Sequence, residues 1–263
     1  MEKKKIKIEP TQILLISLIT VIAIGAILLK LPICNKKPLK LIDSLFVATS
    51  ATCVTGLTTI VPIEQFTFIG QLVLLTLIQI GGIGFMTLIA IVLVFIGKKL
   101  NLSDKLIIKE SLNYNSFNGL VRLIEKISLY TFIIEASGAC ILATRFVPDY
   151  GISKGIWFSI FHSVSAFCNA GFDLLGKTSI VQYAGDGVVC LTIMLLIIVG
   201  GLGFSVWDDI VENIKNKRKL KQLTIHTKIV LIVTGILLVI GTVATYVLEC
   251  DNIQIMKNDS WRN

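Results

Sequence analysis

Two stretches of sequence decide the fold: LIDSLFVATSATCVTGL at residues 41–57 and IWFSIFHSVSAFCNAGF at residues 156–172. They align at a constant spacing of 115 positions, and the identical pairs include serines, cysteines and glycines: Ser50 with Ser165, Cys53 with Cys168, and Gly56 with Gly171. Self-similarity at a fixed spacing indicates that one structural unit occurs twice.

A second pair of matching motifs follows each of these stretches. GGIGF at residues 81–85 aligns with GGLGF at residues 200–204, and the apolar stretches near 11–29 and 127–146 keep a similar spacing. Each copy is therefore predicted to contain a long helix, a short amphipathic segment, a glycine turn and a second long helix.

The composition is that of a membrane protein. The 263 residues are 54% hydrophobic and 16% charged, whereas soluble domains carry about 25% charged residues. Five long apolar stretches lie at 11–29, 65–97, 127–144, 187–207 and 229–248. A bilayer core needs roughly 20 helical residues, and in lipid each span must satisfy its own backbone groups. We therefore predict an all-α integral membrane protein with five transmembrane helices. The first stretch is interpreted as a retained helix, because it is longer than a signal core.

Basic residues predict the orientation, because cytoplasmic loops carry an excess of lysine and arginine. The N-terminus, residues 98–126 and residues 208–228 contain four, six and six of them. This pattern predicts a multi-pass protein of the cell membrane with a cytoplasmic N-terminus. It argues against nucleic-acid binding, since the charges flank apolar spans. One lysine group lies on the opposite side: Lys30, Lys36, Lys37 and Lys40.

The repeats predict five regions along the chain. They are a first helix–pore-helix–helix repeat (10–97), a cytoplasmic linker (98–126), a second such repeat (127–207), a basic cytoplasmic linker (208–226), and the first helix of an incomplete third repeat with a polar tail (227–263). On this interpretation, we expect the sequence to be the front portion of a longer arrangement.

The two short segments, 41–52 and 156–167, are too short to cross a bilayer. Twelve helical residues reach roughly 18 Å, so each is predicted to be a re-entrant half-helix. Irregular backbone at membrane depth is tolerated only where it lines a cavity or is buried in protein. There, carbonyl oxygens can replace the hydration shell of a cation, glycine permits the positive φ angles that this requires, and a helix C-terminus adds partial negative charge.

A carbonyl cage suits a weakly hydrated monovalent cation better than magnesium, which gives up water reluctantly. The predicted ion-binding residues are those that follow the two half-helices: Cys53, Val54, Thr55, Gly56, Cys168, Asn169, Ala170 and Gly171. Asp173 is a weaker candidate for an outer mouth that concentrates cations; a solvated surface carboxylate is the alternative.

The paired motifs SATCVTGL and SAFCNAGFDLLG, with GGIGF and GGLGF, resemble the Trk/Ktr/HKT superfamily of potassium transporters, and its Ktr-type membrane subunit most closely. The resemblance covers residues 10–250 and corresponds to two repeats and the opening of a third, in a potassium-channel-like family with four repeats. It implies potassium uptake with K⁺ on the filter backbone, Na⁺ as a candidate coupling ion, and no cofactor. It also implies a homodimer in membrane lipid with a cytosolic nucleotide-binding regulatory subunit.

Two other functions remain open from the sequence. One is a truncated, non-conducting fragment of such a transporter, because two pore segments do not close a four-fold ring. The other is a solute transporter with broken helices, although that class is typically built from inverted repeats. An enzyme is not expected, since the HExxH motif and the CxxC spacing of a zinc or redox site are absent from the sequence.

Four further features have competing interpretations. The GGIGF and GGLGF glycines are predicted to allow close helix packing, with a gating hinge as the alternative. Glu135 is predicted to make a structural hydrogen bond rather than line an ion path. His162 is predicted to be a satisfied interior side chain rather than a proton sensor. Asp43 is predicted to stabilise the positive N-terminus of its helix.

Overall fold

The computed structural model describes residues 10–84, 120–216 and 222–249, and these are helical apart from loops and one isolated antiparallel bridge between Asn35 and Phe66. Their elements are α1 (Pro10–Lys30), η1 (Pro32–Cys34), α2 (Leu41–Thr52), α3 (Pro62–Gln65), α4 (Phe68–Ile83), α7 (Leu120–Tyr150), α8 (Ile152–Phe167), η2 (Ser179–Tyr183), α9 (Gly187–Gly201), α10 (Phe204–Lys215) and α11 (Ile225–Glu249).

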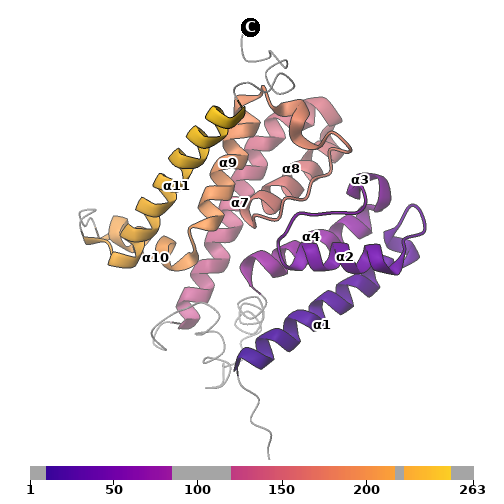
Figure 1. The fold of residues 1–263 in the computed structure, drawn as a ribbon, viewed down its shortest axis with the longest axis horizontal. Helices are drawn as coiled ribbons and strands as arrows, with labels where there is room; N and C mark the ends of the chain where they lie inside the picture. Colours follow the sequence, from indigo (N-terminus) through magenta and orange to yellow (C-terminus); the bar gives the residue numbers. More distant parts are fainter. Residues whose placement is uncertain (1–9, 85–119, 217–221, 250–263) are drawn as a thin grey trace, which may run out of the picture.

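The first unit consists of α1, α2 and α4, which pack on one another (Figure 1). Small apolar residues on one face of α2, Val47, Ala48 and Ala51, are fully buried there. The Ser44 hydroxyl donates a hydrogen bond to the Ala26 carbonyl of α1. Thr67 begins α4 as its N-cap, accepting the backbone N–H of Gly70 at 3.3 Å. Helix α2 is therefore held in place by its buried apolar face and by the hydrogen bond from Ser44 to Ala26.

The second unit repeats this arrangement with α7, α8 and α9. Asp186 caps α9, because its carboxylate accepts the N–H groups of Val188 and Val189 at 2.9 and 3.2 Å. The same carboxylate forms an ion pair with Arg145 of α7, at 3.2 Å. A carboxylate in this position also stabilises the positive end of the helix. One residue therefore determines where α9 begins and how it lies against α7.

The two units meet where α4 lies beside α8. The indole N–H of Trp157 donates to the Gln71 side-chain oxygen at 2.7 Å. Further along α4, the Gln79 amide donates to the Glu135 carboxylate of α7 at 2.9 Å. Hydrogen bonds between polar side chains thus join two otherwise apolar surfaces.

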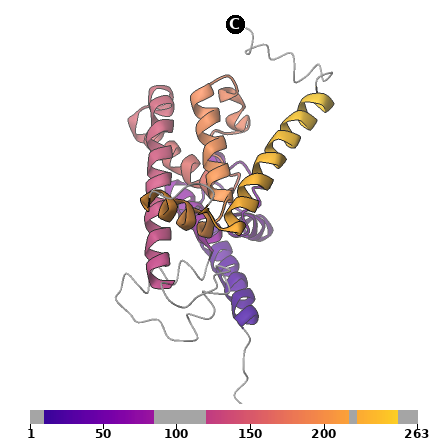
Figure 2. The same ribbon diagram turned by 90° about the vertical axis from the view of Figure 1, so that its left-hand side faces the viewer.

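Helix α11 diverges from the bundle of the other helices, as Figure 2 shows most clearly. It is reached through α10, which bends away from α9 by 98°. In its 18-residue apolar window, none of α11 is buried within the structure. An all-round apolar helix of this kind is typical of a surface that faces lipid or other protein.

The helix bounds agree with the sequence prediction at several points and differ at others. The short helix α2 covers the predicted 41–52, whereas α8 begins four residues before the predicted 156. The stretch 187–207 was predicted as one helix, and this is wrong, because the chain breaks at Gly203 with φ of 87°. In the stretch 65–97, α4 ends at Ile83 before Gly84, whose φ is 86°, and residues 85–97 lie outside the described part.

Two helices of the described residues are long and apolar enough to span a membrane, Glu125–Tyr150 and Ile225–Leu248. A third is added if the bent pair α9 and α10 forms one span, and three further apolar helices are shorter: Leu15–Lys30, Leu41–Thr52 and Phe68–Ile83. The helical content and the apolar helices agree with the predicted class of membrane protein. The predicted five spans stay a prediction.

Candidate functional site

The helices α2 and α8 end in the same way, at matching positions of the repeat. Thr55 N–H donates to the Ser50 carbonyl at 2.8 Å, and Ala170 N–H donates to the Ser165 carbonyl at 2.8 Å. The residue before each donor lies in the left-handed region, with φ of 55° at Val54 and 58° at Asn169. This is the Schellman arrangement, which turns the chain sharply at a helix C-terminus.

The left-handed position is occupied by very different residues in the two units. Asparagine tolerates this conformation, whereas it is a genuine outlier for a β-branched residue such as valine. Backbone strain of this kind persists only where the surrounding structure holds it. Val54 is therefore a strained residue at the start of one predicted ion-binding run, and Asn169 is its relaxed counterpart.

Gly56 and Gly171, which are 115 positions apart, lie in contact. Both have positive φ, 82° and 71°. A Cβ atom added to Gly56 would lie 2.8 Å from the Ala170 carbonyl oxygen and 3.2 Å from the Gly171 Cα. A Cβ added to Gly171 would lie 3.3 Å from the Gly56 Cα. The structure thus brings the ends of the two predicted runs together.

The backbone oxygens of residues 54–56 and 169–171 have no protein donor among the described residues, neither from the backbone nor from side chains. Carbonyl groups without a protein donor usually bond to water or to an ion. A set of unbonded carbonyl oxygens beside two helix C-termini is chemically able to coordinate a cation.

The glycines of GGIGF and GGLGF pack against the ends of the short helices. A Cβ on Gly81 would lie 2.3 Å from the Thr52 carbonyl oxygen, and one on Gly200 would lie 1.8 Å from the Phe167 carbonyl oxygen. Neither distance allows a side chain, which agrees with the predicted packing role for these two glycines. Gly84 and Gly203 differ, since they stand at helix ends with positive φ.

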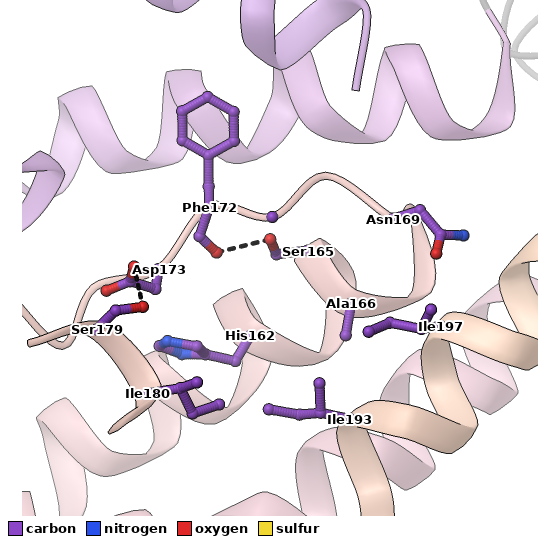
Figure 3. A pocket seen from close by; sticks show the side chains of 11 residues that line it. His162, Ser165, Ala166, Asn169, Phe172, Asp173, Ser179, Ile180, Ile193 and Ile197 are labelled. Carbon is purple, nitrogen blue, oxygen red and sulfur yellow. Dashed lines mark hydrogen bonds between the residues drawn. The ribbon is translucent and has the colours of Figure 1, made fainter. Parts of the chain in front are cut away.

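A cavity of about 220 Å³ lies between α8, η2 and α9, next to the second predicted ion-binding run, residues 168–171 (Figure 3). Two bonds from α8 reach the segment after Gly171: the Ser165 hydroxyl donates to the Phe172 carbonyl at 2.7 Å, and His162 Nε2 accepts the Leu174 N–H at 3.4 Å. His162 Nδ1 lies 2.7 Å from the Phe158 carbonyl. Because that nitrogen must donate to a carbonyl, this geometry fits a neutral ring with the proton on Nδ1.

Asp173 lies in the wall of this cavity (Figure 3). Its carboxylate accepts the Leu175 N–H at 2.9 Å and the Ser179 hydroxyl at 2.8 Å. The side chain is thus held by its own loop, and the predicted place at an outer mouth stays a prediction.

The first unit holds the corresponding segment by other means. Thr59, three residues after Gly56, donates its hydroxyl to the Asp43 carboxylate at 2.8 Å. The Asp43 carboxylate thus lies in the first turn of α2, as predicted for a favourable helix dipole, and also holds the segment after the turn. Ser50, the counterpart of Ser165, has a buried hydroxyl without a partner among the described residues.

Glu135 has a hydrogen-bonded partner, as predicted. Gln79 bridges from it to the second run, since its amide donates to Glu135 at 2.9 Å and its oxygen lies 3.7 Å from the Cys168 sulfur. Sequence reasoning missed Gln79. A signal was present, because a polar side chain within a long apolar stretch is costly in a membrane and usually has a role.

The chain matches the family model of the TrkH cation transport proteins over residues 5–259. It is 42% identical over 249 residues to the Ktr system potassium uptake protein B of Bacillus subtilis (strain 168), covering 95% of this chain and 55% of that protein. It is 38% identical over 259 residues to the potassium/sodium uptake protein NtpJ of Enterococcus hirae, covering 97% and 56%. Another Ktr system potassium uptake protein B, from Vibrio alginolyticus, is 39% identical over 251 residues, covering 95% and 54%.

The described helices are apolar and long enough, in part, to cross a bilayer, and they define the class of helical membrane proteins. Within that class, the chain belongs to the TrkH family of cation transport proteins. It spans about half the length of the curated relatives it matches.

Proposed function

We propose that this chain forms part of a potassium uptake pathway in which backbone carbonyl oxygens of residues 53–56 and 168–171 coordinate the dehydrated ion. The contact between Gly56 and Gly171 carries the proposal. It places two carbonyl-bearing turns of similar geometry beside one another, and none of their oxygens from residues 54–56 and 169–171 has a protein donor in the described regions. Coordination by main-chain oxygens is how potassium-selective filters replace the hydration shell.

The proposal includes the arrangement of the chain in the membrane. Residues 10–97 and 127–207 form two helix–pore-helix–helix repeats, with α2 and α8 as re-entrant half-helices, and residues 227–263 open a third. The matching chain turns after α2 and α8 support this division. The N-terminus lies in the cytoplasm, as the basic residues indicate. The predicted linker at 98–119 lies outside the described residues.

The ion and the partners are inferred from the relatives. Two of these relatives are named as potassium uptake proteins and the third as a potassium/sodium uptake protein. We propose K⁺ as the transported ion and Na⁺ as a candidate coupling ion. A homodimer in the membrane with a cytosolic nucleotide-binding regulatory subunit is the proposed assembly. The Ktr system designation of two relatives supports the regulatory subunit.

The filter glycines provide the test. Gly56→Ala and Gly171→Ala add a Cβ at positions with positive φ and close backbone contacts. Gly176→Ala is the matched control, because Gly176 also has positive φ, 94°, but nothing lies within 4 Å of an added Cβ. Rubidium and sodium uptake are measured in a host that lacks its own potassium uptake systems.

We expect each filter variant to lose selectivity for rubidium over sodium by at least roughly tenfold, which corresponds to 1.4 kcal/mol. The Gly176 variant should retain it. The chain is assayed alone and joined to the part of the Bacillus subtilis relative that the match leaves out. Absence of uptake in both forms, or unchanged selectivity in both filter variants, would overturn the proposal.

A further inference from the structure

A second cavity, of about 470 Å³, lies between the two units and has no part in the proposed ion path. Its walls come from α4 and from the first half of α8, together with the segments near Lys36 and Leu175. The rings of Phe68 and Trp157 line it, with centroids 4.7 Å apart. We call this cavity the inter-unit groove.

Two lysines lie at the groove, and among the described residues no acidic side chain lines it. They are Lys36 and Lys154, both exposed. The ion pairs of the described residues involve neither of them. Lys36 Nζ donates only to a neutral acceptor, the Ile63 carbonyl, at 2.6 Å. The groove therefore carries two positive charges without a protein counter-charge in the described part of the chain.

Lys154 lies at an electrostatically unfavourable position. It lies in the first turn of α8, which contains no acidic residue. A helix N-terminus carries partial positive charge, so a lysine there is electrostatically unfavourable. An external anion between Lys36 and Lys154 would remove this repulsion.

The surface beside the groove is itself apolar. On α4, Phe68 and Ile69 are 57% and 43% exposed, and on α8, Ile152 is 72% exposed. In a membrane protein, an exposed apolar surface of this kind is suited to contact with acyl chains. The groove is therefore continuous with an apolar surface, and it joins an apolar floor to a cationic rim.

We propose that the inter-unit groove binds one anionic phospholipid. The phosphate lies between the ammonium groups of Lys36 and Lys154, and an acyl chain lies against Phe68 and Trp157. The aromatic floor favours a lipid over a free phosphate, and the net positive rim favours an anionic over a zwitterionic headgroup. The site also gives a role to Lys36, one of the lysines that the orientation rule does not explain. This proposal depends on a membrane location only and is independent of ion transport.

Trp157 provides a local reporter. The chain has three tryptophans, so Trp207→Phe with Trp261→Phe leaves Trp157 as the single fluorophore. The variant is placed in bilayers with brominated phosphatidylglycerol or brominated phosphatidylcholine, and quenching is measured against lipid fraction. Near an anionic headgroup, each lysine contributes about 1 kcal/mol, or about fivefold, so we expect a preference of roughly 25-fold for phosphatidylglycerol.

Lys36→Gln with Lys154→Gln should reduce this preference to nearly one. The matched control is Lys37→Gln with Lys177→Gln, which removes the same charge outside the groove and should keep the preference. Lys154→Gln alone is the second variant if the double substitution lowers helical content by circular dichroism, and it should lose about half of the preference on a logarithmic scale.

Equal quenching by the two lipids, or a preference that survives in the lysine variants, would overturn the proposal. Displacement of brominated phosphatidylglycerol by millimolar inorganic phosphate would overturn it in favour of a free anion. Loss of rubidium uptake plays no part in the measurement, so failure of the proposed transport function would be seen separately.

Discussion

At the scale of single residues, the two matched turns show how one backbone geometry is built from unequal sequences. Val54 and Asn169 have nearly the same φ, 55° and 58°. The hydrogen bonds around them also correspond, since Thr55 and Ala170 donate to matching carbonyls at 2.8 Å. The intrinsic preference for the left-handed region differs, because only asparagine adopts it readily. The fold therefore imposes the conformation on Val54.

Exchanging the two residues should reveal this strain. Val54→Asn should stabilise the protein and Asn169→Val should destabilise it, each by about 1 kcal/mol, because strained backbone positions cost on the order of 1–3 kcal/mol. Thermal unfolding in detergent measures both changes. A stabilising Asn169→Val would show that the surroundings, rather than the residue, determine the energy of the turn.

His162 accepts a hydrogen bond from the segment that follows Gly171, at the Leu174 N–H. His162→Phe keeps an aromatic ring beside Phe146, 5.4 Å away between centroids, but removes the acceptor for the Leu174 N–H. An unpaired buried donor costs about 1–3 kcal/mol. We expect lower stability and faster hydrogen exchange at the Leu174 amide.

His162→Gln is the control, since its side-chain oxygen can reach the position of Nε2 and should restore slow exchange. Equal exchange at Leu174 in the wild type and the phenylalanine variant would contradict the assigned bond.

At the scale of elements, the sequence predicts the kinds of helices better than their ends. The end of α2 at Thr52 and that of α8 at Phe167 were predicted, because small residues and a glycine follow each. The breaks at Gly84 and Gly203 were not, because both lie within continuous apolar stretches. Hydropathy reports which residues enter lipid, whereas a break depends on φ at one glycine.

The candidate site was predictable to a similar extent. The repeat spacing identified Gly56 and Gly171, but their mutual contact depends on how α4 packs beside α8. The bonds of Gln79 and of Thr59 likewise join residues far apart in sequence. No local pattern specifies such pairs, so only the folded chain reveals them.

Packing of α9 against α8 depends on one small residue. Gly200→Ala would place a Cβ 1.8 Å from the Phe167 carbonyl oxygen. Overpacking of this kind typically costs 1–3 kcal/mol, so we expect a lower unfolding temperature by at least a few degrees. The neighbouring Gly201→Ala is the control, because its Cβ would be 3.8 Å from the nearest atom, Asn169 Nδ2. Similar unfolding temperatures for the two variants would contradict this account.

At the scale of the whole molecule, hydrogen bonds between polar side chains join the two units in the described part of the chain. Trp157 and Gln71 form one of them, and Gln79 with Glu135 forms another. Between apolar helices, such bonds can determine how one unit is aligned on the other.

A double-mutant cycle measures that alignment. Gln71→Leu and Trp157→Phe each remove one partner of the 2.7 Å bond. We expect a coupling energy of about 0.6 kcal/mol, up to about 1.7, as is usual for side-chain bonds between membrane helices. Strictly additive effects on unfolding would show that the bond contributes nothing to the union of the units.

The meeting of Gly56 and Gly171 within one polypeptide has a practical consequence for genetics. In a pore that is built from identical subunits, one altered codon changes the corresponding residue in every subunit at once. Here Gly56 and Gly171 are encoded by separate codons, so mutations can change the first turn, the second turn, or both. The two turns also have different residues near them, since Val47 in the first repeat corresponds to His162 in the second. Natural selection can therefore adjust the rigidity of each turn independently of the other.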